Sequence, residues 1–82
     1  MKFNELLREI HHRVEVKERT RITQGAMADR LRISARTYIE YLRGTNSPLS
    51  MRAMLDLLSQ LTDDEIVIVV REWSLQQEID RH

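Results

Sequence analysis

The segment from Gln24 to Arg43 constrains the fold of this chain more than any other stretch. Its apolar residues recur at helical spacing in two short runs that meet at Ile33, and Gly44 directly follows the second run. The residues that we expect to face inward are Met27, Ala28, Leu31, Tyr38, Tyr41 and Leu42. Glycine often ends a helix, because it adopts the left-handed backbone conformation without strain. The pattern therefore predicts two short helices, at about 24–31 and 35–43, joined by a tight turn.

Hydroxyl residues mark the beginnings of both helices. Thr23 precedes the first and Ser34 precedes the second, and both residue types are favoured helix N-caps. Turn-forming residues at 45–48 then indicate a loop. A helix hairpin that buries one side and displays an arginine-bearing helix on the other has the shape that enters a DNA major groove.

Helical periodicity predicts three further helices, at about 4–18, 50–61 and 63–79. In the first of these we expect a core stripe formed by Phe3, Leu6, Leu7, Ile10 and Val14. In the second we expect Met54, Leu57, Leu58 and Leu61 to face inward, with Ser50 at its start. His11 and His12 flank the first stripe, and we expect both at the surface. The chain is thus predicted to be all-α, with five helices in a single domain over 1–82.

The last predicted helix is unusual because it is apolar on two opposite sides. Thr62 and Glu65 form a capping-box pattern at its start. One side carries Ile66, Val69, Val70 and Trp73, and the opposite side carries Ile68, Leu75 and Ile79. We interpret one side as closing the domain core and the other as meeting a second chain, so the expected dimer interface comprises Ile68, Leu75, Ile79 and Trp73. Trp73 fits either role, and the alternative is that the helix lies in a deep groove of its own domain.

Composition excludes several classes of protein. A domain of 82 residues is small, and without cysteine it has neither disulfides nor a cysteine-based metal site. Three histidines do not form a ligand set, and no nucleophile elbow or phosphate-binding glycine loop is present. We therefore expect no enzyme activity, cofactor or metal. The longest apolar run, Ile66–Val70, is too short to span a bilayer, and we expect a cytoplasmic protein.

Charge is distributed unevenly along a chain whose formal net charge is zero. Residues 1–52 hold eleven Lys and Arg against six Asp and Glu, whereas residues 53–82 hold two against seven. A basic front and an acidic back suit a protein that presents one face to phosphates and the other to a partner or to solvent.

The stretch from Ile22 to about Leu61, roughly half of the chain, resembles the Cro/C1-type helix-turn-helix family, also called lambda-repressor-like or Xre. The residues that carry the resemblance are Thr23, Gln24, Ala28, Leu31, Ile33, Ser34, Arg43, Gly44 and Pro48. Two positions depart from the family pattern: Arg32 stands where glycine is usual, and Leu42 stands where many relatives have Glu. The resemblance implies a five-helix fold and a DNA-binding transcriptional regulator, usually a dimer on an inverted repeat.

The resemblance also implies which residues meet double-stranded DNA. The expected base contacts are Ser34, Ala35, Arg36, Ile39 and Glu40. The expected backbone contacts are Thr23, Gln24, Arg43, Thr45, Asn46 and Arg21. The planar fork of Arg36 fits guanine O6 and N7, whereas Glu40 either accepts from cytosine N4 or orients Arg36 through an i, i+4 pair.

The leading hypothesis is a dimeric repressor or autoregulator of phage or plasmid type, associated with the nucleoid. One alternative is an antitoxin or protein-binding adaptor built on a helix-turn-helix fold, which the zero net charge and the two-sided last helix support. A second alternative is a helical scaffold without a role at DNA.

Overall fold

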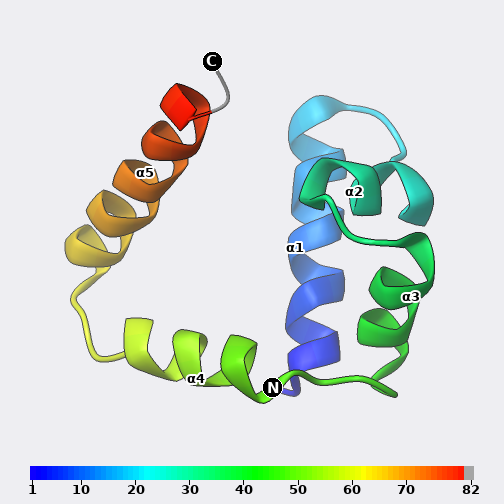
Figure 1. The fold of residues 1–82 in the computed structure, drawn as a ribbon, viewed down its shortest axis with the longest axis horizontal. Helices are drawn as coiled ribbons and strands as arrows, with labels where there is room; N and C mark the ends of the chain where they lie inside the picture. Colours follow the sequence, from blue (N-terminus) through cyan, green and yellow to red (C-terminus); the bar gives the residue numbers. More distant parts are fainter. Residues whose placement is uncertain (81–82) are drawn as a thin grey trace. The chain divides into compact units, whose positions relative to one another are not determined.

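The computed structural model describes residues 1–80, and this part of the chain is all-α, with five helices and no strand. The helices are α1 (Phe3–Glu18), α2 (Gln24–Leu31), α3 (Ala35–Arg43), α4 (Leu49–Leu58) and α5 (Asp63–Asp80) (Figure 1). They form two compact units. The first unit is Met1–Pro48 and contains α1 to α3, and the second begins at Leu49 and contains α4 and α5.

The first unit has a core built mainly from the helix hairpin. Its buried residues are Ile22, Met27, Ala28, Tyr38 and Leu42, and Leu7, Val14 and Ile33 pack against them. Helix α1 runs beside α2 and α3 (Figure 1), so that it covers the apolar side of the hairpin. At the N-terminal end of α1, the ring of Phe3 packs edge to face against that of Tyr41, with centroids 6.2 Å apart.

Two residues expected to face inward in this unit are exposed instead. Ile10 is 46% exposed and Leu31 is 52% exposed. The packed side of α1 is centred on Leu7, His11 and Val14, so Ile10 falls at its edge. Leu31 is the last residue of α2 and stays outside the core beside the turn.

The N-caps predicted for the hairpin are confirmed. The Thr23 hydroxyl accepts the N–H of Ala26 at 3.0 Å, and the Ser34 hydroxyl accepts the N–H of Thr37 at 3.0 Å. Each bond satisfies a donor that the first turn of a helix leaves free. The first helical residues of α2 and α3 therefore follow directly from the sequence.

The three helices of the first unit all end in left-handed residues. Arg19 (φ 56°), Arg32 (φ 59°) and Gly44 (φ 80°) occupy the C-caps of α1, α2 and α3. The turn at Arg32 thus keeps the geometry that usually employs glycine, at a cost of about 1–2 kcal/mol for a residue with a side chain. At Gly44 a Cβ would also lie 3.3 Å from the side chain of Asn4, so the end of α3 fits closely against the start of α1.

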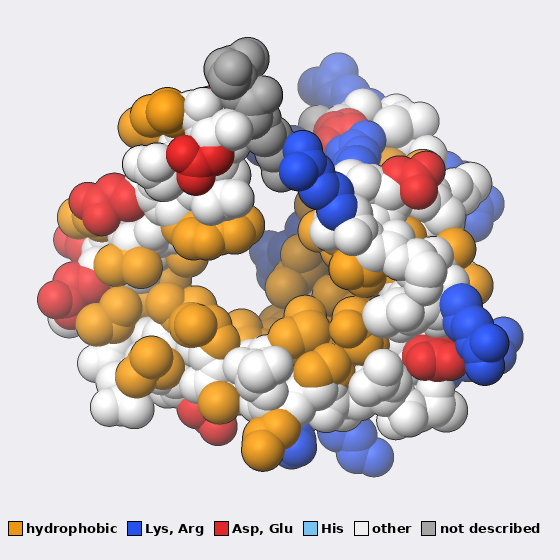
Figure 2. Space-filling model, in the orientation of Figure 1, with side chains coloured by type: hydrophobic (Ala, Val, Ile, Leu, Met, Phe, Trp, Pro, Cys, Tyr) orange, Lys and Arg blue, Asp and Glu red, His pale blue; other side chains and the backbone are white. Residues whose placement is uncertain are grey.

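The second unit differs from expectation in α4. The helix begins at Leu49 and ends at Leu58, so Ser50 lies inside its first turn and Leu61 lies beyond its end. Met54 and Leu57, expected to face inward, are exposed. Neither α4 nor α5 has a buried residue, because two helices have too little facing surface to enclose side chains on several sides. Hydrophobic side chains are accordingly visible on the surface of this unit (Figure 2).

The start of α5 agrees with its predicted capping box. The Thr62 hydroxyl accepts the N–H of Glu65 at 3.3 Å, and the N–H of Thr62 donates to the Glu65 carboxylate at 2.9 Å. The backbone N–H of Thr62, and after it the Thr62 hydroxyl, hold the pKa of Glu65 below its ordinary value, because they favour the ionised carboxylate. Among the residues that the structure describes, no helix is both long and apolar enough to cross a membrane.

Candidate nucleic-acid interface

Helix α3 separates its buried side from a charged side. Tyr38 and Leu42 point into the core, whereas Arg36 and Arg43 are exposed on the opposite side. The side chain of Arg36 is 90% exposed, and its Nε donates to the Glu40 carboxylate at 3.2 Å. An exposed i, i+4 pair of this kind is weak, so the guanidinium remains available to a stronger partner.

The five residues predicted to contact bases lie at the N-cap of α3 and along its first six residues, but they are not equally exposed. Ser34, Ala35 and Arg36 are exposed, while Ile39 and Glu40 are half-buried. Besides capping α3, the Ser34 hydroxyl donates to the Thr37 hydroxyl at 2.8 Å. Ile39, an expected apolar base contact, is half-buried, so only part of its side chain is accessible.

The six residues predicted to contact the DNA backbone are all exposed. Arg21, Thr23 and Gln24 surround the start of α2, and Arg43, Thr45 and Asn46 surround the end of α3. The hydroxyl of Thr45 donates to the Glu40 carbonyl at 3.2 Å, which stabilises the chain just after α3. The expected backbone contacts thus lie at the two ends of the hairpin, before α2 and after α3.

His11 connects three segments of the first unit, although we expected it at the surface. It lies on the packed side of α1, where its side chain is 12% exposed. Its Nε2 lies 2.8 Å from the Ile22 carbonyl, and its Nδ1 lies 2.7 Å from the Tyr38 hydroxyl. The signal in the sequence was its spacing from Leu7 and Val14, which places the imidazole on the apolar side of α1. His12, by contrast, is exposed as predicted.

The hydrogen-bond partners indicate which nitrogen carries the proton in the neutral imidazole. The Ile22 carbonyl can only accept, so Nε2 carries a proton, and in the neutral ring Nδ1 accepts from the Tyr38 hydroxyl. Burial, with a smaller contribution from the nearby Glu15 carboxylate, raises the pKa of Tyr38, which keeps this hydroxyl protonated. Glu15 also accepts the N–H of Ile22 at 2.8 Å.

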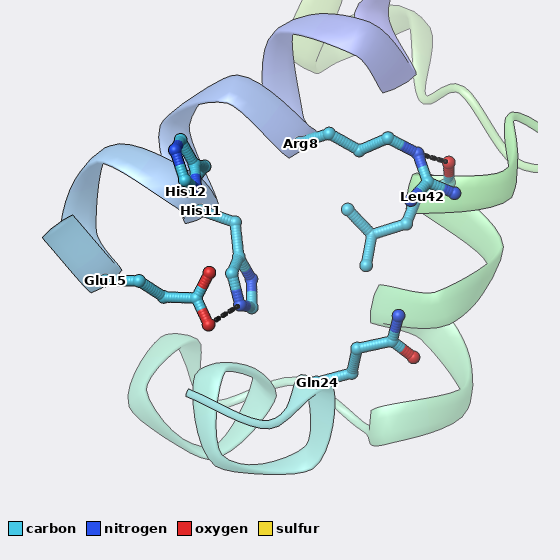
Figure 3. A pocket seen from close by; sticks show the side chains of 6 residues that line it. All are labelled: Arg8, His11, His12, Glu15, Gln24 and Leu42. Atoms are coloured by element: carbon cyan, nitrogen blue, oxygen red, sulfur yellow. Dashed lines mark hydrogen bonds and ion pairs between the residues drawn. The ribbon is translucent and has the colours of Figure 1, made fainter. Parts of the chain in front are cut away.

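Arg8 provides a contact between α1 and the end of α3. Its Nε donates to the Leu42 carbonyl at 2.9 Å, one of the carbonyls that a helix leaves without an internal partner (Figure 3). Between this contact and the start of α2 lies a depression of about 120 Å³, lined by Arg8, His11, His12, Glu15, Gln24 and Leu42. It holds no nucleophile beside a base, and among residues 1–80 no group of three His, Asp or Glu could hold a metal ion.

A bidentate ion pair joins α2 to α1 at the surface. The Arg30 guanidinium donates to both Glu18 carboxylate oxygens, at 2.7 and 2.8 Å. These hydrogen bonds hold the pKa of Glu18 below its ordinary value and raise that of Arg30. Arg30 is therefore held by two short hydrogen bonds, whereas Arg36 makes one longer contact, with Glu40.

The predicted dimer-interface residues lie in the second unit. Ile68, Trp73, Leu75 and Ile79 are all exposed on α5. Their arrangement on opposite sides of the helix follows the predicted pattern, and the pairing of α5 with a second chain stays a prediction.

No family model, curated protein or solved structure matches the chain.

Proposed function

We propose that this protein is a sequence-specific DNA-binding transcriptional regulator that places α3 in the major groove. The observation that carries the proposal is the division of α3, with Tyr38 and Leu42 buried and Arg36 and Arg43 exposed on the opposite side. Major-groove recognition requires this arrangement, because one side of the helix must be supported by the domain while the other reaches base edges. The resemblance of 22–61 to the Cro/C1-type family supports the same proposal.

In this proposal the exposed residues divide the work by their chemistry. Arg36 reads guanine, because its planar fork matches the O6 and N7 acceptors. Glu40 orients Arg36 in the free protein through the ion pair at 3.2 Å. Thr23, Gln24 and the N-terminal amides of α2 meet a phosphate, and Arg21 adds charge that is independent of sequence.

Dimerisation through α5 would place two copies of α3 in successive major grooves, about 34 Å apart. The site would then be an inverted repeat, and occupancy of a promoter would repress the gene, in the simplest case the regulator's own. The exposed apolar residues on two sides of α5 support this part of the proposal. A cytoplasmic, nucleoid-associated location follows from the proposed role.

Selection from a random duplex DNA pool at one fixed, moderate salt concentration tests the function. Enrichment of an inverted repeat with half-sites about one helical turn apart is the expected result. Absence of any enriched motif, with binding that disappears as salt rises, would leave only charge attraction and overturn the proposal.

Two arginine variants then separate base recognition from backbone attraction. We expect Arg36→Ala to abolish preference for the selected site, because the side chain that reads guanine is gone. Arg21→Ala should instead weaken binding to selected and random duplexes alike and lower the salt slope by about one. Both affinities are measured by fluorescence anisotropy over a salt series. Equal losses on both DNAs for both variants would contradict the assigned roles.

One observation favours a second function. From Leu49 onward the chain holds seven Asp and Glu against three Lys and Arg, and it also carries the exposed apolar residues of α5. A protein partner with a basic, partly apolar surface would fit such a segment, as in an antitoxin or adaptor. Stoichiometric recovery of one other protein with the tagged chain, together with failure to select a DNA motif, would favour this function.

A further inference from the structure

Two side chains of α1 hold the backbone immediately before α2. The N–H of Ile22 donates to Glu15 Oε2 at 2.8 Å, and the C=O of Ile22 accepts from His11 Nε2 at 2.8 Å. Ile22 is itself buried, and the next residue is Thr23, the N-cap of α2. Because both polar groups of one residue are held by a neighbouring helix, the start of α2 has a defined position on α1.

The same imidazole also holds α3. His11 Nδ1 accepts from the Tyr38 hydroxyl at 2.7 Å, and the two rings stack with centroids 5.8 Å apart. Tyr38 is 1% exposed and lies in the middle of α3, on the side opposite Arg36. A single ring therefore connects the start of α2 to α3 through two directional bonds, and neither bond can lengthen without leaving a sheltered polar group unsatisfied.

We propose that His11 and Glu15 are positioning residues of the DNA site, which fix the start of α2 relative to α3. The inference rests on the proposed DNA binding. A helix-turn-helix must place phosphate contacts at α2 and base contacts at α3 in one register on the duplex. Loss of the His11 bonds lets this register vary, so binding to the selected site falls. Binding to random DNA, which depends on charge, falls less, because the exposed cations are unchanged.

Four variants test the two hydrogen bonds of His11. Tyr38→Phe removes only the hydroxyl that donates to His11, and His11→Phe removes both bonds of the imidazole. His11→Gln extends an amide toward the Nε2 position and retains a donor for the Ile22 carbonyl, whereas His11→Asn places its amide near Nδ1. Val14→Ala is the matched control, because Val14 packs against the same core and makes none of these hydrogen bonds.

The measurement is the ratio of affinities for the selected site and a random duplex at one salt concentration, together with the melting temperature of each variant. We expect Tyr38→Phe and His11→Phe to lower the ratio about tenfold, the discrimination lost when one base contact is no longer held in register. His11→Gln should retain more of the ratio than His11→Phe. Val14→Ala should keep the wild-type ratio at a comparable loss of melting temperature.

The outcomes separate this inference from the function on which it rests. If the wild type selects no DNA motif, the proposed function fails, and the inference fails with it. If the wild type selects a motif but Tyr38→Phe retains the full ratio, only the positioning role is overturned. A drop in ratio for Val14→Ala equal to that for Tyr38→Phe would also overturn it, since stability alone would then explain the loss. Should His11→Phe fail to fold, Tyr38→Phe carries the comparison.

Discussion

The two units of this chain differ in whether they enclose a hydrophobic core. The first, Met1–Pro48, encloses a small core and ties its segments together with hydrogen bonds from side chains such as Arg8, His11 and Glu15. The second, from Leu49 onward, has two well-formed helices but no buried residue among those described. A local signal such as the Thr62 cap sets where a helix begins, whereas a core requires a third surface.

This difference also separates the proposed roles of the units. The hairpin needs a fixed geometry, because base recognition depends on the placement of α3. The two apolar sides of α5 are exposed, and exposed apolar patches are typical of surfaces that bind another protein. Substitutions of the same kind in the two units should therefore have different consequences.

The largest expected difference is between two leucines truncated in the same way. Leu42, on α3, is 3% exposed, and Leu75, on α5, is 59% exposed. Leu42→Ala should lower the free energy of unfolding by about 2–5 kcal/mol, because it leaves a cavity in the core. Leu75→Ala should change it by less than about 0.5 kcal/mol at concentrations where the protein is monomeric. Urea unfolding followed by circular dichroism measures both, and equal losses would remove the distinction between the units.

The next effect concerns association through α5. Leu75→Asp introduces a charge into the predicted interface and should weaken dimerisation about tenfold or more. Val67→Asp is a matched control, because Val67 has a similar exposure of 57% and lies between the two apolar sides of the helix. Sedimentation equilibrium measures the association constant. A monomeric wild type at high concentration would show that α5 does not pair with a second copy.

Loss of an N-cap should lower stability by a smaller amount. The number of residues affected should differ between the two units. Ser34→Ala and Thr62→Ala each remove a capping hydroxyl worth about 1 kcal/mol. We expect Ser34→Ala to lower the melting temperature of the first unit as a whole, because α3 belongs to its core. Thr62→Ala should mainly speed amide exchange in the first turn of α5. Calorimetry and hydrogen exchange detect these changes, with Ser47→Ala, in an exposed loop, as the control.

The smallest effect expected is that of acid, through one carboxylate in each unit. The pKa values of Glu18 and Glu65 lie below their ordinary values, the first because of Arg30 and the second because of Thr62. A lowered pKa contributes stability that is present at neutral pH and is lost as pH falls below about 4 toward the folded value. Acidification should loosen the α1–α2 contact at Glu18 and the start of α5 at Glu65. Carboxyl titration by NMR tests this, with Glu18→Gln removing only the first change.

Helices with strong local signals were predicted well from the sequence. The ranges 24–31 and 35–43 match α2 and α3, because the caps at Thr23 and Ser34 and the left-handed end at Gly44 depend only on neighbouring residues. The end of α4 was predicted three residues too late, because the residues after Leu58 carry no glycine or proline that would stop a helix. Exposure of Ile10 was missed because periodicity gives the apolar side of α1 only to within about one residue.

The contacts of His11 illustrate what a sequence does not disclose. Its partners are the carbonyl of Ile22 and the hydroxyl of Tyr38, which lie 11 and 27 positions away along the chain. A backbone carbonyl has no sequence signature, and only the packing of α1 against the hairpin brings these groups together. The residues proposed to meet DNA, in contrast, were chosen from their place on short helices, and their exposure follows from the same spacing apart from Ile39 and Glu40.

The attachment of Ile22 to α1 has a consequence for how this chain tolerates change in length. The connection between Glu18 and Ile22 is exposed. Hydrogen bonds with His11 and Glu15 fix the position of Ile22, so this position does not depend on the length of the connection. Extra residues inserted around Thr20 would bulge into solvent and leave α2 where it is. The connection between α2 and α3 has no such freedom, because Arg32 and Ile33 are the turn itself. Variation in length should therefore accumulate before the hairpin and be absent within it.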